Sequence, residues 1–354
     1  MEKFVLKYFN LLRTIIAVLI GIAISVLLIF LISKDPGFSL QQFLLGPLLS
    51  RSRFSSMIEM ASPIIMCGLG IAVAFQARQF NVGAEGALYV GAALGTGFAV
   101  STALPAFLHL PLTLLVAGAV GAFWGMLTGI LKAKWRGIEL VASLLLNYVG
   151  YYLGLYLINF HFRDKNAGYL VSYQLPKSAW LAQFVPNTRM HYGILLSLAF
   201  AVLVFWFLYH STTGYEIRMT GANEKFARFG GINVFKVVVL CQLALGLLSG
   251  IGGMGEVMGI HRRFNWQDTP GYGWDGVVVA IIGRNHPLLI VAASFFLAYL
   301  RVGGQVLNLM SDVPAEMVAV IQSIIILLIT AEAFLAQWRF RITVAQAERQ
   351  GEAA

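Results

Sequence analysis

Apolar runs long enough to cross a lipid bilayer take up most of this chain and constrain its fold more than any other feature. A spanning helix needs about 20 predominantly apolar residues, because every backbone amide inside hydrocarbon must be hydrogen-bonded within its own helix. The ten predicted segments, of which the eighth is too short to span alone, cover residues 14–33, 60–77, 85–105, 111–131, 140–160, 191–210, 236–259, 276–283, 287–309 and 315–338. The sequence therefore predicts an all-α, polytopic membrane protein.

Composition excludes the main alternative classes. Of the 354 residues, 58% are apolar and 12% are charged, whereas soluble domains carry about 25% charged residues. These charges are too few to cover a soluble multidomain enzyme, and the apolar residues are too many for a disordered chain. The formal net charge of +9 is compatible with nucleic-acid binding, but in a membrane protein it first indicates basic cytoplasmic loops. We expect no nucleic-acid partner.

Basic residues indicate the orientation. With a cytoplasmic N-terminus, the inside segments hold 15 Lys and Arg and the outside segments hold 9, in agreement with the positive-inside rule. We therefore expect both termini in the cytoplasm and a single permease domain over residues 1–354. Residues 14–33 are too long for a signal-peptide core and are expected to stay as the first helix. Two long outer segments are expected at 34–59, with an interfacial helix, and at 161–190.

A short pattern occurs twice. Residues 78–81 read R-Q-F-N and are followed at 83–86 by G-A-E-G, while residues 262–265 read R-R-F-N and are followed at 273–276 by G-W-D-G. Five predicted helices separate the copies, which places them on opposite sides of the bilayer. This predicts an inverted-topology repeat, with residues 60–160 as the first copy and 236–338 as the second. Alternatively, the glycine-acid-glycine elements are ordinary helix starts whose acid complements the helix dipole.

Glycine spacing predicts close helix packing. Gly121, Gly125 and Gly129 form a double GxxxG pattern, and Gly91 and Gly95 form another. Small residues of this kind let membrane helices approach closely. Residues 250–255 match the dinucleotide fingerprint GxGxxG, but they lie in an apolar run without the required strand, so we interpret them as a flexible or kinked helix end.

Motifs for catalysis and metal binding are missing from the sequence. It contains no P-loop, HExxH or G-x-S-x-G pattern, and its two cysteines, Cys67 and Cys241, are isolated in apolar runs. We therefore expect no catalytic residue, no metal site and no cofactor in this chain. We also find no series of carboxylates and histidines at membrane depth that would form a proton relay, which counts against an ion-driven mechanism.

The longest predicted cytoplasmic loop covers residues 211–235. It contains a short amphipathic helix with Lys225, Ala227 and Arg228, and glycines stand on both sides of this helix. Such an element can dock into a groove of another protein and transmit rigid motion to the flanking spans. A solvated basic loop is the alternative, but it would not need the glycines.

Three motifs in order resemble one family. Residues 214–232, GYEIRMTGANEKFARFGGI, resemble the coupling helix of ABC importer permeases in the simple-sugar and nucleoside branch. Residues 80–86, F-N-V-G-A-E-G, resemble the F-N-I-G-A-E-G signature of that branch, and residues 271–276 and 283–287 resemble its later elements. The likeness covers residues 60–332. The form at 80–86 is more similar to nucleoside permeases that depend on basic-membrane-lipoprotein receptors than to ribose permeases, although Ala87 stands where glutamine is frequent.

This resemblance implies partners. Two permease subunits, often two different ones, would enclose a central path, ATPase subunits carrying ATP and Mg would grip the coupling helices, and an external binding (lipo)protein would deliver the solute. The protein would be a multi-pass component of the bacterial plasma (inner) membrane and not itself an enzyme. The residues that the resemblance places in the ATPase-facing site are Gly221, Ala222, Asn223, Glu224, Ala227 and Gly230.

A nucleoside offers a ring that stacks on aromatic side chains and hydroxyls that bond to amides or acids. On this basis the candidate residues of the solute path are Phe80, Asn81, Glu85, Asn147, Trp274 and Asp275. Helix packing or capping is the alternative role for each of them.

Other functions are left open by the sequence. A simple-sugar importer permease of the same family is one alternative, and an ion-coupled secondary transporter, which also uses inverted repeats, is another. An integral-membrane enzyme acting on lipid would need a nucleophile with a base or a metal cluster, and the sequence offers neither.

Overall fold

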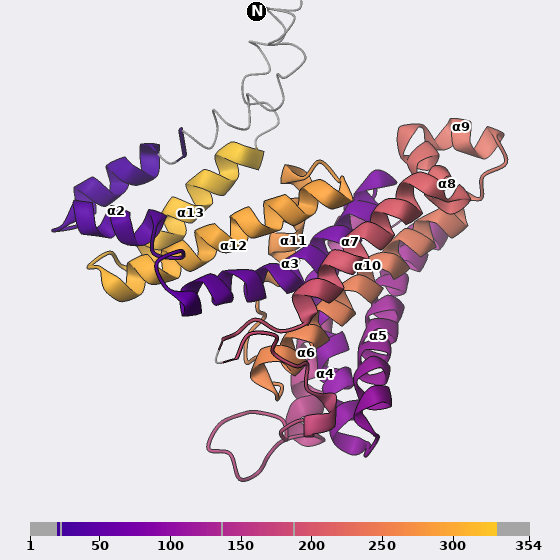
Figure 1. Ribbon diagram of the computed structural model, residues 1–354. Coiled ribbons are helices and arrows are strands. Elements are labelled where there is room, and N and C mark those ends of the chain that lie inside the picture. The colour runs from indigo at the N-terminus through magenta and orange to yellow at the C-terminus, as the bar shows by residue number, and fades with distance from the viewer. Residues whose placement is uncertain (1–19, 22, 136, 187, 331–354) are drawn as a thin grey trace, which may run out of the picture. The chain divides into compact units, whose positions relative to one another are not determined.

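The computed structural model describes residues 20–330, except residues 22, 136 and 187 (Figure 1). Parts of the first and last predicted segments, 14–19 and 331–338, lie outside the described residues. The described chain is built from helices, and its extended pairing is limited to two isolated bridges, Arg163 with Ser172 and Gln183 with His191. The all-helical prediction is confirmed.

Two compact units emerge from the contacts among the described residues. One combines residues from the two ends of the chain, within Met1–Ser50 and Leu300–Ala354, and the other is Arg51–Tyr299. The helices that begin in the second unit are α3 (Arg51–Gln76), α4 (Ala84–Ser101), α5 (Ala106–Trp135), α6 (Glu139–Phe160), η1 (Lys177–Ala179), α7 (Gly193–His210), α8 (Thr212–Ala222), α9 (Glu224–Phe229), α10 (Val234–Glu256), η2 (Val257–His261), α11 (Tyr272–Ile282) and α12 (Pro287–Met310). The first unit contains α2 (Pro36–Leu44) and α13 (Ala315–Thr330). The predicted single permease domain over 1–354 stays a prediction.

Six of the described helices are long and apolar enough to cross a membrane, namely α3, α5, α6, α7, α12 and the continuous pair α10–η2. Three shorter apolar helices are Ala23–Ile32, α11 and Ala315–Leu328. At 11 residues, α11 reaches about 16 Å at a rise of 1.5 Å per residue, which is about half the hydrocarbon thickness. The prediction of a short eighth segment is therefore confirmed, while the total of about ten spans and the orientation stay predictions.

Some helix boundaries differ from the predicted ones. The predicted segment 60–77 begins nine residues earlier, because the polar stretch from Arg51 is helical and its Glu59 is buried. The predicted segment 111–131 begins at Ala106, so Pro111 lies inside α5. Apolarity marks the part of a helix that lies in lipid or protein, but it does not mark polar turns that continue the same helix.

Close packing of α5 on α10 confirms the predicted role of the glycines. A side chain at Gly121 would collide with the backbone of Gly246, and one at Gly125 would collide with the backbone of Gln242. On α4, a side chain at Gly91 would also come too close to the backbone of Ala117. The GxGxxG residues 250–255 are helical and lie in α10, so they form no dinucleotide-binding loop.

The two copies of the repeated motif adopt the same local structure. Arg78 follows α3 and Arg262 follows η2, and both have left-handed backbones, with φ of 54° and 55°. In each copy a Phe-Asn stretch without regular secondary structure follows, and then a new helix, α4 or α11, begins. The copies also exchange partners, because α3 packs on α11 and α10 packs on α4. This agrees with a structural repeat, and its inverted orientation in a membrane stays a prediction.

Candidate functional site

Two short helices, α8 and α9, form a helical elbow at one end of α7 and α10 (Figure 1). Ser211 caps α8 by accepting a hydrogen bond from the Gly214 amide at 2.9 Å, and Asn223 caps α9 by accepting one from the Phe226 amide at 3.1 Å. The predicted short helix around Lys225 is confirmed as α9, while α8 was not predicted. The elbow corner at Asn223 therefore has a fixed geometry rather than that of a loose loop.

The six residues predicted to face an ATPase all lie on this elbow, but they differ in solvent exposure. Ala222, Asn223, Glu224 and Gly230 are exposed, whereas Gly221 and Ala227 are buried. The elbow also presents two aromatic side chains outward that were not predicted, Phe226 and Phe229, the latter 92% exposed. Their spacing of three residues on a charged helix, which places both on one face, was the available signal.

The inner side of the elbow lies against the end of α3. A side chain at Gly221 would collide with the backbone carbonyl of Gln76, so only glycine permits this approach. A hollow of about 230 Å³ lies beside the contact, lined among others by Arg78, Lys132 and Asn223. The Gln76 side chain in turn donates to the Asn285 carbonyl at 3.1 Å. Two family-like motifs that are remote in sequence, residues 214–232 and 283–287, are thus connected through the end of α3.

The N-termini of α4 and α11 meet at the side chain of Glu85. Its carboxylate accepts hydrogen bonds from the backbone amides of Gly271 at 2.7 Å and Gly273 at 2.5 Å, which are otherwise free donors at the start of α11. Gly271 has a left-handed backbone with φ of 84°, and a side chain at Gly273 would collide with Glu85. We call this contact the half-helix junction.

The N-terminus of α4 is also held by an amide from α6. Asn147 accepts from the Gly86 amide at 2.8 Å and donates to the Val82 carbonyl at 2.9 Å. Asn81 lies one residue before Val82 and donates to the Thr128 hydroxyl at 2.9 Å. These contacts match the capping alternative that the sequence left open.

The six candidate path residues therefore fall into two groups. Asn81, Glu85, Asn147 and Asp275 are buried around the half-helix junction. The remaining two, Phe80 and Trp274, are about half-exposed aromatic residues, and Phe80 stacks on Phe75 with ring centroids 5.0 Å apart. Contact of any of them with a solute stays a prediction.

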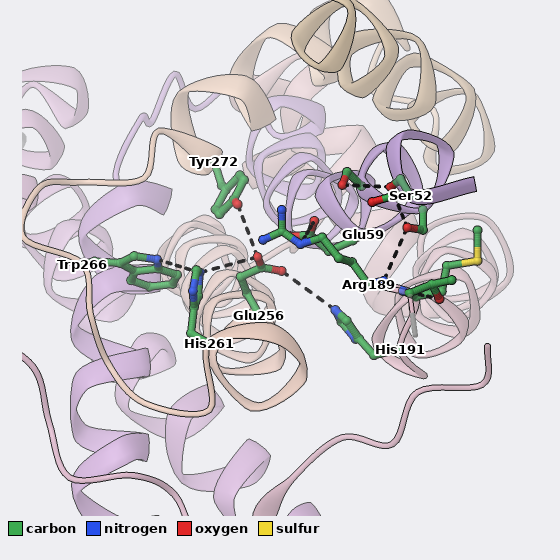
Figure 2. Close-up of polar contacts among 12 residues, drawn as sticks. Ser52, Glu59, Arg189, His191, Glu256, His261, Trp266 and Tyr272 are labelled. Atoms are coloured by element: carbon green, nitrogen blue, oxygen red, sulfur yellow. Dashed lines mark hydrogen bonds and ion pairs between the residues drawn. The ribbon is translucent and has the colours of Figure 1, made fainter. Parts of the chain in front are cut away.

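A second polar group, which we call the Glu256 cluster, lies at the other end of α3 and α10 (Figure 2). Figure 2 shows Glu256 at its centre, with His191 Nε2 and His261 Nε2 at 3.9 and 3.8 Å from the carboxylate and the Tyr272 hydroxyl at 3.5 Å. The remaining members are Glu59 and Arg189, which form an ion pair at 3.5 Å. This buried gathering of carboxylates and histidines was not predicted, and the expectation about membrane depth stays a prediction.

The cluster escaped sequence analysis because its members come from five elements and share no local spacing. His191 shows how the fold creates it. The Gly193 amide donates to Nδ1 of His191 at 3.0 Å, so the proton of the neutral ring is on Nε2, which faces Glu256. Burial, followed by the nearby Arg189, lowers the pKa of His191 to about 4, and the ring is therefore neutral at pH 7.

The described residues form six helices long and apolar enough to cross a membrane, a short helix α11 whose start meets that of α4, and an exposed elbow at one end, and this arrangement is typical of a polytopic membrane transport protein. Comparison with known proteins makes this specific. The family profile described as "Branched-chain amino acid transport system / permease component" matches residues 53–330. The chain belongs to this family of transport-system permease components and is a multi-pass protein of the plasma (inner) membrane.

Relatives with assigned solutes include three permeases. A glucose ABC transporter permease of Haloferax volcanii is 32% identical over 96% of this chain and 91% of its own length. A guanosine ABC transporter permease of Bacillus subtilis is 34% identical over 77% of this chain and 80% of its own length. A nucleoside ABC transporter permease of Lactococcus lactis is 24% identical, with 90% of each chain covered. The chain is thus a membrane subunit of the ABC transporter class.

Proposed function

We propose that this permease is the transmembrane subunit of an ATP-driven importer for nucleosides, and that separate ATPase subunits dock on the elbow. The observation that carries the proposal is the elbow itself. Its outer side presents Phe226 and Phe229, and its inner side contacts the end of α3 without an intervening side chain at Gly221. A force applied to the exposed aromatic residues is thereby passed to the backbone of Gln76.

From Gln76 the movement has a direct route to the half-helix junction. Residues 77–83 connect α3 to α4, whose first turn carries Glu85, and Glu85 holds the start of α11. Because the N-terminus of α4 meets that of the short helix α11, a shift of one N-terminus changes the access to the space between them. On this proposal ATP and Mg act only on the partner ATPase, and this chain performs no chemical step.

The predicted membrane topology fits the same proposal. With about ten spans and a cytoplasmic N-terminus, the elbow faces the ATPase in the cytoplasm and residues 161–190 face an external binding protein. A second permease subunit, identical or paralogous, would complete the solute path.

Nucleosides are the proposed solutes because two of the relatives above carry guanosine or nucleoside in their names and because residues 80–86 have the nucleoside-permease form. A simple sugar is the second candidate, since the glucose-permease relative is 32% identical over almost the whole chain. The buried Glu256 cluster raises a third, ion-coupled transport, which would need no ATPase.

Transport by the reconstituted complex tests these candidates together. We expect proteoliposomes that contain the permease, its partner subunits and the binding protein to take up labelled guanosine only when ATP is supplied. Excess unlabelled nucleoside should compete, and glucose or ribose should not. Uptake of the sugars but not of guanosine would replace the solute, and uptake driven by a proton gradient without ATP would replace the mechanism.

A further inference from the structure

The two faces of α6 differ in chemistry. Its buried face carries Ser143, Asn147, Gly150, Gly154 and Ile158 and packs on α4 and α5. Its exposed face carries Val141, Leu145, Tyr148, Val149, Tyr152, Leu153, Tyr156 and Phe160. Three tyrosines thus follow one another at intervals of four residues along one face. We call Tyr148, Tyr152 and Tyr156 the tyrosine face.

Two members of the tyrosine face, Tyr148 and Tyr152, lie near the middle of α6, a helix long and apolar enough to cross a membrane. In a helix from Glu139 to Phe160, Tyr148 and Tyr152 are about 2 and 4 Å from the midpoint and Tyr156 is about 10 Å from it. Hydrocarbon extends about 15 Å to either side of the centre. Tyr148 and Tyr152 are each 65% exposed, and none of the three hydroxyls has a hydrogen-bond partner among the described residues.

Contact with lipid would leave the hydroxyls of the tyrosine face without hydrogen-bond partners. Tyrosine favours the membrane interfaces, where its hydroxyl reaches water, and a hydroxyl in hydrocarbon lacks any partner. The exposed face of α7 makes the contrast, because from Leu195 to Leu203 it consists of Leu195, Ala199, Val202 and Leu203, and its first polar atom beyond them is the indole nitrogen of Trp206. Lipid contact explains the composition of α7 but not that of α6.

We propose that the tyrosine face lines the aqueous solute pathway and that its rings stack on the base of the transported nucleoside. The identity of the solute in this proposal rests on the proposed function. Flat phenol rings suit a planar base, and their hydroxyls can donate to ring nitrogens and carbonyl oxygens.

The surroundings of the tyrosine face support this assignment. The ring centroid of Tyr152 lies 5.0 Å from that of Tyr151, which lies 5.3 Å from that of Tyr89 on α4. Tyr89 in turn contacts Phe264 of the second repeat copy at 5.1 Å. Aromatic contacts thus connect the face to both copies of the repeat. On the same helix, Asn147 holds the N-terminus of α4 at the half-helix junction.

Cysteine labelling in the assembled complex tests the proposal. We would introduce Tyr148→Cys, Tyr152→Cys and, as a matched control on an equally exposed but apolar face, Val202→Cys, whose residue is 60% exposed. The native Cys67 and Cys241 are buried, so the unchanged complex gives the background. The probe is a charged, membrane-impermeant methanethiosulfonate applied to membranes that contain all subunits.

We expect both tyrosine-face cysteines to be modified and Val202→Cys to stay at background. Guanosine at about ten times its half-saturating concentration should slow the modification about tenfold, because only about one site in eleven is then free. Tyr156→Cys provides a second reading if one of the variants fails to assemble.

Two results would overturn the proposal. Modification no faster than that of Val202→Cys places the face in lipid or in a dry contact with another subunit or with other helices of this chain. Modification that guanosine does not slow, in a complex that transports guanosine, removes the stacking role. The labelling without solute does not depend on which solute is carried, so a transporter that carries only sugars would contradict the proposed function while leaving the aqueous face intact.

Discussion

Among single residues, His191 has the surroundings that most clearly determine its protonation state. It lies before α7, is buried, and has its Nδ1 fixed by the Gly193 amide. A protonated ring would lose that hydrogen bond and would place a positive charge near Arg189. The fold therefore keeps His191 neutral, with Nε2 facing the Glu256 carboxylate at an N–O distance of 3.9 Å.

This arrangement predicts a stability that depends on pH. The pKa of His191 is about 4 in the folded protein and about 6.5 in an unfolded chain. Between these values the unfolded state binds more protons, so stability is fully present above pH 6.5 and declines as pH falls toward 4. The loss at pH 5 should be on the order of 1–2 kcal/mol.

Thermal unfolding of the purified complex at several pH values measures this. The midpoint should be level from pH 8 to 7 and should fall below pH 6, and His191→Gln should reduce the fall. An unchanged fall in that variant would assign the acid sensitivity to other groups.

At the same scale, sequence reasoning found Glu85 and Asn147 but not the Glu256 cluster. Glu85 stands near glycines in a repeated motif, so the adjacent sequence marks it as a candidate residue. His191 and Glu256 are 65 residues apart, and nothing near either residue marks it. Long-range polar contacts of this kind exist only after helices have packed, and one sequence does not record them.

At the scale of elements, the half-helix junction depends on one carboxylate that serves two backbone amides. Glu85→Ala should leave the amides of Gly271 and Gly273 without a partner, at a cost of about 1–3 kcal/mol for each buried donor. Glu85→Gln retains one acceptor oxygen and should cost less. Thermal unfolding of the complex compares the two variants with Glu224→Ala, which removes an exposed carboxylate at the start of α9.

The expected order of unfolding midpoints is Glu224→Ala above Glu85→Gln above Glu85→Ala. Equal midpoints for Glu85→Ala and the control would show that the carboxylate does not hold the junction.

Helices were predictable where long runs of apolar residues define them. Most spanning helices and the short α11 follow from runs of apolar residues, and the contact of α5 with α10 follows from glycine spacing. The helical start of α3 and the whole of α8 were missed, because polar helices receive their stability from tertiary packing and capping, as Ser211 provides for α8.

At the scale of the whole Arg51–Tyr299 unit, three helices connect the Glu256 cluster to the elbow. α3 connects Glu59 to Gln76. α7 lies between His191 and Ser211, and α10 lies between the elbow and the end at Glu256. The distance along α3 is about 26 Å at 1.5 Å per residue. Packed helices transmit displacement because protein interiors deform little. Sequence alone suggested the elbow as a lever, but not which helices it would move.

The central claim is that an ATPase subunit binds the elbow, and cross-linking measures this most directly. Phe229→Cys, at a position that is 92% exposed, would be treated with a short bifunctional reagent in membranes that contain the complete transporter, with Leu203→Cys on α7 as the control. The account predicts a product that contains this chain and the ATPase for Phe229→Cys alone. A cysteine at 229 that reacts with impermeant reagent only from the external side, or a product without the ATPase, would contradict it.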